Sequence, residues 1–428
     1  MPSDRTDPLY VERLDPLDGL EVFRQAPPPG AASVSVSYLA PAGWAYDSAG
    51  EEGTAQMAAQ LMTCGAGRLD RLALARRLDE LGGSLTARCH PESSEVTVWG
   101  PTDAFDDLVR LLADSIVRPR FEAREVARLR REMFERQLRE ASMPQSRAER
   151  ALFERIFPVG HPYRLSGIGT RRSVGRLTPA GLARFRRDHY TEEGGTLVVT
   201  AARAPLALRR ALGGVFRGFD QVRAPPLPPR PDVAAPKPQR HEVEMEGRTQ
   251  VEIRVGGPSI PRSAPEYPAL YLANQVLGGR PLLGRLFQRV RERHGLAYHA
   301  SSEIEAMAWG GYWLAQAGTG PERALKTVAL VEQEVRRMRE ETVPSAELHE
   351  IRESAIGELP LELEDTSSAH ELALDVAYHR LAPDFYRTWN RVLRAVSPAQ
   401  LRRAAEAGLD GAHAVTVLAG PPASVPPA

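Results

Sequence analysis

A proline-rich segment near the middle of the chain is the feature that most constrains its fold. Seven of the 14 residues from Pro225 to Pro238 are proline. Because proline fixes φ and lacks a backbone N–H, this segment can form neither a helix nor a central strand, and it favours an extended, stiff conformation. The 428 residues also exceed what a single hydrophobic core accommodates. We therefore predict one domain at 1–224, a linker at 225–240 and a second domain at 241–428.

Both halves repeat one order of elements. A helix followed by strand-like segments and a second helix occurs twice, and each half closes with a helix that begins at proline and is capped by Thr178 or Ser397. The first helix of each repeat ends at glycine and carries apolar residues at helical spacing: Leu74, Leu78 and Leu81 in one half, Leu282, Leu286 and Val290 in the other. This order predicts an α+β fold made of two homologous domains, each an antiparallel-rich sheet with helices packed on one face.

The composition excludes several classes of protein. Lys+Arg 55 balances Asp+Glu 55, so no net charge attracts nucleic acid or anionic lipid. Only Lys237 and Lys326 are lysines, and this excess of arginine is typical of a GC-rich, bacterial genome. Cys64 and Cys89 are too few for a disulfide framework. No apolar signal core or membrane-spanning stretch is found in the sequence, so we expect a cytoplasmic protein without a membrane partner.

Several short motifs occur in a characteristic order along almost the whole chain. With them, the chain resembles the M16 family of zinc peptidases, the insulinase and pitrilysin group, and most of all its short two-domain M16B members. The motifs are Leu17-Asp18-Gly19-Leu20, Gly160-His161-Pro162-Tyr163, Gly167-Ile168-Gly169-Thr170, Asp188-His189-Tyr190, Leu277-Gly278-Gly279 and the segment Arg285–Tyr298.

Active members of that family carry His-x-x-Glu-His on a helix, where two imidazoles one turn apart bind zinc and the carboxylate acts as a general base. The resemblance places Gln56, Ala59 and Gln60 at these positions. The family's third ligand, a glutamate, falls near Glu135 or Arg136. A neutral amide is a poor zinc ligand and alanine moves no proton, so we expect no catalytic metal in this chain. By themselves, Gln56 and Gln60 are also compatible with an ordinary polar helix face.

The second half retains more of the family pattern. There the resemblance implies a substrate role for an arginine and a tyrosine, matched by Arg291 and Tyr298. A guanidinium can hold a peptide carbonyl, and a phenol can stabilise the oxyanion that forms during hydrolysis. Gly278 and Gly279 would let a peptide backbone approach closely, although Arg280 replaces a smaller residue. The alternatives are a solvated arginine, a tyrosine that starts a strand, and a glycine helix cap.

Together these patterns favour a non-catalytic subunit of a heterodimeric M16B peptidase. Its partner would be a homologue with intact His-x-x-Glu-His that holds the zinc, and Arg291 and Tyr298 would act in trans on a peptide or unfolded polypeptide. The chain would be inactive alone. The alternative is a structural or peptide-binding protein of this fold with no role in proteolysis. A self-sufficient peptidase would need metal ligands that the ten histidines do not supply at any known spacing.

Overall fold

The computed structural model describes residues 6–219, 224–226, 228 and 233–422. These residues form two compact units. The first contains Met1–Gln137, Gly167–Pro229 and Pro360–Thr388, and the second contains Leu138–Ser166, Arg230–Leu359 and Trp389–Ala428. Each half of the sequence therefore contributes a segment to the unit that consists mainly of the other half. The division at 1–224, 225–240 and 241–428 describes the sequence repeat, and the compact units cut across it. Residues 227 and 229–232 of the linker lie outside the described part.

The first unit is built on a six-stranded sheet in which only β2 and β8 run parallel. Each of the other pairs is antiparallel. In spatial order the strands are β1 (Val11–Leu17), β2 (Leu20–Gln25), β8 (Thr196–Thr200), β3 (Ser33–Ala40), β7 (Ser94–Pro101) and β6 (Ser84–Cys89). A separate short antiparallel pair, β4 (Gly65–Ala66) and β5 (Leu69–Asp70), comes between β3 and β6 in the sequence.

The main core of this unit lies on one face of the sheet. Strand β3 alternates in character, and Val34, Val36 and Tyr38 are completely buried in that core. Aromatic stacking of Tyr38 on Tyr190 and Phe219 extends it. The helices that supply the other side are α1 (Thr54–Leu61), α2 (Arg71–Glu80), α3 (Phe105–Val117), α4 (Ala123–Ser142), α7 (Pro179–His189) and α8 (Pro205–Leu212); α6 (Arg171–Arg176) precedes α7.

The opposite face of this sheet carries the serines of β3 and is covered by α12 (Thr366–Tyr378), which comes from the second half of the sequence. Ser33 Oγ donates to Thr366 Oγ1 at 2.8 Å. His370 lies between Ser37 and Thr200, and its two ring nitrogens are each 2.8 Å from a hydroxyl oxygen. Polar sheet residues that usually face water therefore contact a helix here.

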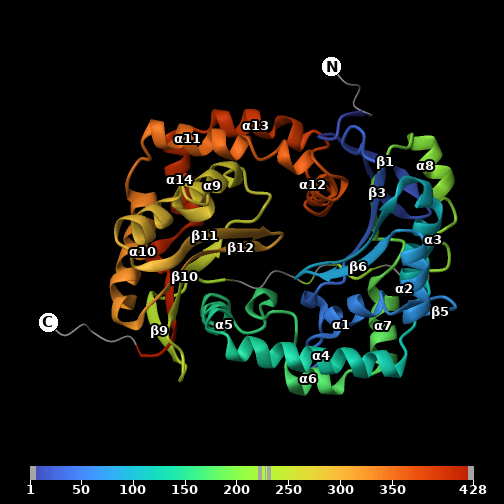
Figure 1. Ribbon diagram of the computed structural model, residues 1–428, viewed down its shortest axis with the longest axis horizontal. Coiled ribbons are helices and arrows are strands. Elements are labelled where there is room, and N and C mark those ends of the chain that lie inside the picture. The colour runs from blue at the N-terminus through green and yellow to red at the C-terminus, as the bar shows by residue number, and fades with distance from the viewer. Residues whose placement is uncertain (1–5, 220–223, 227, 229–232, 423–428) are drawn as a thin grey trace. The chain divides into compact units, whose positions relative to one another are not determined.

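The second unit has a five-stranded sheet of the same kind. Its strands, in spatial order, are β11 (Ala297–Met307), β12 (Gly310–Thr319), β10 (Val251–Ser259), β13 (Val415–Gly420) and β9 (Gln239–Glu244), and only β13 and β9 run parallel. The helices of this unit are α5 (Pro144–Ile156), α9 (Tyr267–Asn274), α10 (Ala324–Glu340), α11 (Ser345–Ile356) and α14 (Pro398–Gly408), and α13 (Phe385–Ala395) leads into it (Figure 1).

The central strand of this sheet, β10, repeats the pattern of β3. Val251, Ile253 and Val255 are buried, and α9, α10 and α14 pack in the same unit on the sheet and on one another. The intervening residues Glu252 and Arg254 form an ion pair at 3.0 Å on the face that α5 covers. Helix α5 comes from the first half of the sequence, and its Gln145 donates to Glu252 at 3.1 Å.

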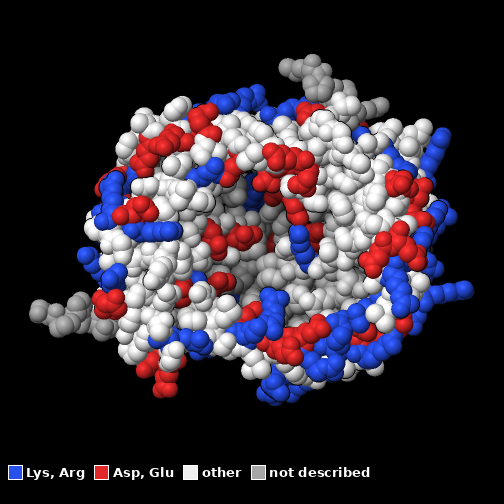
Figure 2. Space-filling view, viewed as in Figure 1, with Lys and Arg blue, Asp and Glu red and all other residues white. Residues whose placement is uncertain are grey.

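The structure confirms the predicted α+β class with two antiparallel-rich sheets. The expectation that helices pack on one face only is wrong, because α12 and α5 cover the second face of their sheets. Acidic and basic side chains both occur across the visible surface (Figure 2), as the balanced composition implies. Among the described residues, every helix is too short or too polar to cross a membrane.

Candidate functional site

Gln56, Ala59 and Gln60 lie on α1, as the sequence predicted for a helix at this place. The helix begins after Gly53, whose φ is 100°. The carboxylate of Asp47 accepts hydrogen bonds from the backbone nitrogens of Gly53 at 2.7 Å and Ala55 at 2.8 Å, so it caps α1 from outside the helix. Gln56 and Gln60 are one turn apart and half-buried, and Ala59 is buried.

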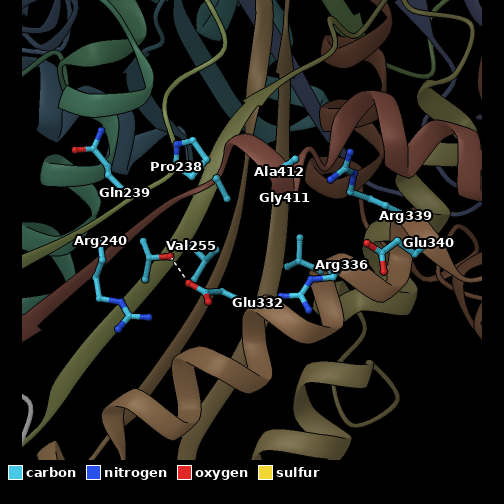
Figure 3. Close-up of a pocket in the computed structure, with 13 residues that line it drawn as sticks. Pro238, Gln239, Arg240, Val255, Glu332, Arg336, Arg339, Glu340, Gly411 and Ala412 are labelled. Atoms are coloured by element: carbon cyan, nitrogen blue, oxygen red, sulfur yellow. Dashed lines mark hydrogen bonds between the residues drawn. The ribbon is translucent and has the colours of Figure 1, made fainter.

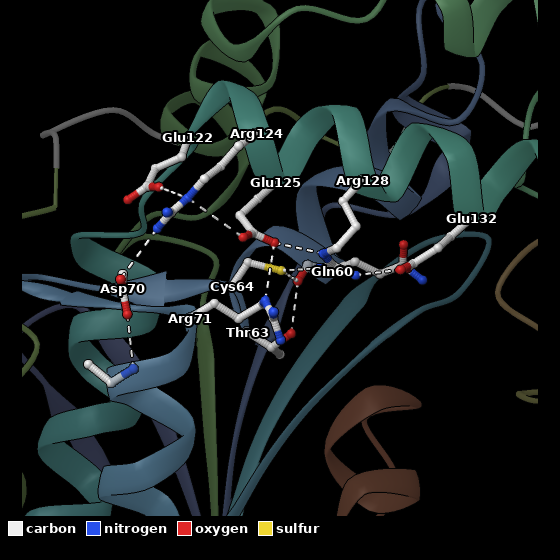
Figure 4. A network of polar contacts seen from close by, with 11 residues as sticks. Gln60, Thr63, Cys64, Asp70, Arg71, Glu122, Arg124, Glu125, Arg128 and Glu132 are labelled. Atoms are coloured by element: carbon white, nitrogen blue, oxygen red, sulfur yellow. Dashed lines mark hydrogen bonds and ion pairs between the residues drawn. The ribbon is translucent and has the colours of Figure 1, made fainter.

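The guanidinium of Arg128 on α4 contacts Cys64, which follows the end of α1. Arg128 donates to Glu125 at 2.7 Å, to Glu132 at 2.6 Å and to the Sγ atom of Cys64 at 3.2 Å (Figure 4). Burial raises the pKa of the Cys64 thiol, which donates to the backbone oxygen of Gln60 at 3.4 Å. No motif in the sequence pointed to Arg128. Glu125 and Glu132 lie at ordinary helical spacing from it, and Cys64 is 64 residues away.

The donor set at these positions does not fit zinc. Two neutral amides and a methyl group replace two imidazoles and a carboxylate, and Glu135 and Arg136 are exposed on α4. Across the described ranges, His, Cys, Asp and Glu side chains form no group of three or more that could hold a metal ion.

The predicted substrate-handling residues lie in the second unit. Arg291 belongs to the π-helix η6 (Phe287–Arg293), and its guanidinium lies 5.0 Å from the centre of the Phe287 ring. The arginine side chain is exposed. Gly295, with φ of 58°, ends the helical segment, and the backbone nitrogen of Leu296 donates to the oxygen of Val290. π-Helical turns are rare and are frequent at functional sites.

Tyr298 is the extra residue of a β-bulge. Ala297 pairs with Thr319 and His299 pairs with Gly318, so Tyr298 has no partner on β12. Strand β11 is also the edge strand of its sheet. The side chain of Tyr298 is 73% exposed, which is unusual for a tyrosine in a strand. Bulges are enriched next to active sites, where they redirect a side chain.

Gly278 and Gly279 end a second π-helix, η5 (Gln275–Gly279). A Cβ atom on Gly278 would lie 2.8 Å from the backbone nitrogen of Ser302, and one on Gly279 would lie 2.5 Å from Asn274 Nδ2. The close approach that requires glycine here is therefore the packing of η5 on β11 of the same unit. Approach of a peptide to these glycines stays a prediction. Arg280, the next residue, forms an ion pair with Glu358.

Strand β11 brings these elements together, because both η5 and η6 pack against it. The arrangement is anchored by Arg285, whose Nε and Nη2 atoms donate to the two carboxylate oxygens of Glu347 on α11 at 2.7 and 2.8 Å. Arg285 is buried. Arg285 begins the motif Arg285–Tyr298, but no pattern in the sequence identifies its partner, which lies 62 residues away.

The segment between the two π-helices differs from the prediction. Leu282 was expected on a helix with Leu286 and Val290, but it has φ of 64° and is 61% exposed in a turn. Pro281 and the preceding pair of glycines end η5 before it can continue. Leu283 is exposed as well, so two apolar side chains face solvent at this turn.

Comparison with known proteins finds matches to models of peptidase family M16 and to relatives named as zinc proteases. A family model described as insulinase, peptidase family M16, matches residues 25–161, and the model of the peptidase M16 inactive domain matches residues 176–355. An uncharacterized zinc protease of Streptomyces coelicolor is 28% identical over 47% of this chain and 44% of its own length. Another, of Mycobacterium tuberculosis, is 28% identical over 86% of this chain and 83% of its own length.

The fold matches a solved structure over almost its whole length. The crystal structure of a peptidase M16 inactive domain from Pseudomonas fluorescens has a TM-score of 0.90 with 21% identity, and the match covers 97% of this chain and 99% of that one. At this identity the match shows the fold, whereas the two sequence models span both repeats. The chain belongs to peptidase family M16.

Proposed function

We propose that this chain is the non-catalytic subunit of a heterodimeric M16B peptidase and acts on a peptide or unfolded polypeptide together with a zinc-bearing partner. The observation that carries the proposal is the contrast between the two units. One lacks zinc ligands at Gln56, Ala59 and Gln60. The other presents an exposed phenol and an exposed guanidinium from the bulge at Tyr298 and the π-helix at Arg291.

The geometry of the second unit suits a role in substrate handling. A tyrosine with a purely structural role would bury its ring, because removing the apolar ring from water is its main contribution to stability. Tyr298 instead exposes most of its surface, so its hydroxyl is available to donate to an oxyanion that develops on a peptide carbonyl. Arg291 offers five N–H donors that can hold a neighbouring carbonyl in place.

The partner in this proposal is a homologue of similar length with intact His-x-x-Glu-His, which supplies the zinc. Arg291 and Tyr298 act on the scissile peptide in trans, and neither residue binds metal. The alternative function is a structural or peptide-binding protein with no role in proteolysis. It is consistent with the same loss of ligands at Gln56 and Gln60.

A peptidase assay separates the two functions. The purified chain, a homologue with intact His-x-x-Glu-His encoded nearby, and their mixture are assayed on a set of unstructured peptides, with and without a chelator. We expect cleavage by the mixture well above the sum of the separate chains, and its loss with chelator. Absence of both a complex and added activity would reject the subunit role and leave the binding-protein alternative.

A further inference from the structure

A pocket in the second unit takes no part in the proposed function. It has a volume of about 490 Å³ and is lined by α10, by strands β9, β10 and β13, and by the turn that precedes β13 (Figure 3). Its position follows from the sheet order. Helix α10 packs on β10 and β12, whereas β9 is the edge strand beyond β13. The side of α10 that faces β9 and β13 is therefore left open. The volume of the pocket is in the range of small-molecule sites.

One face of α10 supplies most of the charged lining. Glu332, Val335, Arg336, Arg339 and Glu340 recur at spacings of three and four residues, so they lie on the same side of the helix. Arg240 on β9 adds a third guanidinium from across the pocket. The lining thus combines three positive charges with two negative ones.

Arg339 has an unused hydrogen-bond donor. Its Nη2 atom lies 3.3 Å from Asp410 Oδ1, but its Nε atom is buried and has no acceptor among the described residues. That nitrogen has almost no accessible surface, so Arg339 lines the pocket with the rest of its half-buried side chain.

The guanidiniums of Arg240 and Arg336 are available to pair with a ligand. In the described part of the chain, neither Arg240 nor Arg336 forms an ion pair within 4.0 Å, although both line the pocket. Of the carboxylates, Glu332 accepts a hydrogen bond from Thr416 at 2.7 Å. Glu340 is exposed at the last residue of α10.

The remaining walls are apolar. Val255 and Val335 lie on the sheet and on α10, and both side chains are almost completely buried. Ala412 and Ala414 add small side chains from the turn before β13. A ligand that contacted this lining would gain from burying a short hydrocarbon as well as from ionic contacts.

We propose that this pocket binds a small organic anion, in which a carboxylate or phosphate group is attached to a short apolar body. The oxyanion pairs with Arg336 and Arg240, and the apolar body contacts Ala412 and Ala414. Charge-assisted hydrogen bonds to guanidinium favour both head groups, so the head group is left to experiment. The inference is independent of peptide cleavage and of the partner chain.

Isothermal titration calorimetry on the purified full-length chain tests this assignment. The probes are sodium hexanoate and hexyl phosphate, and acetate and inorganic phosphate serve as head groups without the apolar body. We expect saturable binding of one probe per chain, with a weaker response to its head group alone. Binding of hexanoate only, or of hexyl phosphate only, supports the site and identifies the head group.

Two arginine variants and one matched control complete the test. Arg336→Gln and Arg240→Gln should each weaken binding about tenfold, because each removes one charge from the pocket. Arg337→Gln changes the next residue of α10, which pairs with Glu334 and Glu341 and does not line the pocket, and it should leave the dissociation constant unchanged. The assignment is overturned by absence of saturable binding, by arginine variants that bind as tightly as the unchanged chain, or by head groups that bind as tightly as the probes.

Discussion

His370 Nε2 lies 2.8 Å from Ser37 Oγ, although 333 positions separate the two residues in the sequence. The other ring nitrogen is 2.8 Å from Thr200 Oγ1, and Thr200 in turn donates to Gln25 Oε1 at 2.9 Å. Because the Thr200 proton is used in that bond, its oxygen accepts from Nδ1–H. Burial disfavours the charged form of this imidazole, which joins α12 to the sheet of the first unit.

This contact makes the stability of the protein sensitive to acid. Burial lowers the pKa of His370 to about 3, from 6.5 in an unfolded chain. Between these values the unfolded state binds a proton that the folded state does not, so stability falls as pH drops from 6.5 toward 3. The shift corresponds to a loss of about 2 kcal/mol at pH 5 relative to pH 7.5. His370→Gln keeps a donor and an acceptor and should remove this loss in urea unfolding measured at both pH values. His349→Gln, at an exposed position of α11, should retain it.

Tyr298→Phe tests the proposed oxyanion contact. The ring remains and only the hydroxyl is lost, so peptide binding by the complex should change little while kcat falls about 100-fold. Steady-state kinetics of the mixed complex would show the difference between kcat and KM. Tyr10→Phe removes a hydroxyl from the other unit and should leave both constants unaltered. An unchanged kcat in Tyr298→Phe would remove the catalytic role of this residue.

Arg291→Gln tests the contact to a peptide carbonyl. The loss of a charged donor should weaken transition-state binding, and kcat/KM of the complex should fall about tenfold or more. Arg293→Gln is a close control, because Arg293 is exposed at the end of the same π-helix. Equal effects of the two substitutions would indicate that general positive charge, rather than a contact by Arg291, supports activity.

The ion pair that anchors this region joins a buried arginine to a half-buried glutamate and should matter for stability. Glu347→Gln leaves the buried Arg285 guanidinium without its carboxylate, and we expect the free energy of unfolding to fall by about 2 kcal/mol. Urea unfolding followed by circular dichroism measures the change. Glu350→Gln, at an exposed position of the same helix, should change stability by less than about 0.5 kcal/mol. Similar values for the two variants would show that the ion pair is dispensable.

The helix α1 should still support metal binding when imidazoles are restored. Gln56→His together with Gln60→His places two ring nitrogens one turn apart on a half-buried face. We expect this double variant to bind zinc at least about tenfold more tightly than either single variant, since only the pair can chelate. Zinc content after dialysis and calorimetric titration provide the measurement. Identical affinities in the single and double variants would mean that the two side chains do not share a face.

Much of the fold was accessible from the sequence because it depends on local patterns. The linker prolines, the capped helices that begin at Pro179 and Pro398, and the β-branched strands that follow them all have local physical causes. The bulge at Tyr298 has no such signal. It is a difference in register between β11 and β12, and register depends on how two strands pair rather than on either strand alone.

The sequence also could not predict that α12 and α5 each cover the second face of a sheet. Ser33, Ser35 and Ser37 alternate with buried valines, and this pattern usually indicates a strand with one face in water. Nothing near these serines in the sequence indicates that His370 completes their hydrogen bonds. Glu252 and Arg254 present the same problem for α5, because a charged sheet face gives no sign of which helix will satisfy it.

The contribution of α12 to the first unit also sets an order for folding on the ribosome. Residues 366–378 are synthesised after more than four fifths of the 428 residues, so the nascent first unit exposes the face that holds Ser37 and Thr200 until translation is nearly complete. The second unit has the opposite history, since α5 is made before the sheet that it covers. The first unit, most of which is synthesised first, therefore cannot complete its fold until α12 has been translated near the end of synthesis.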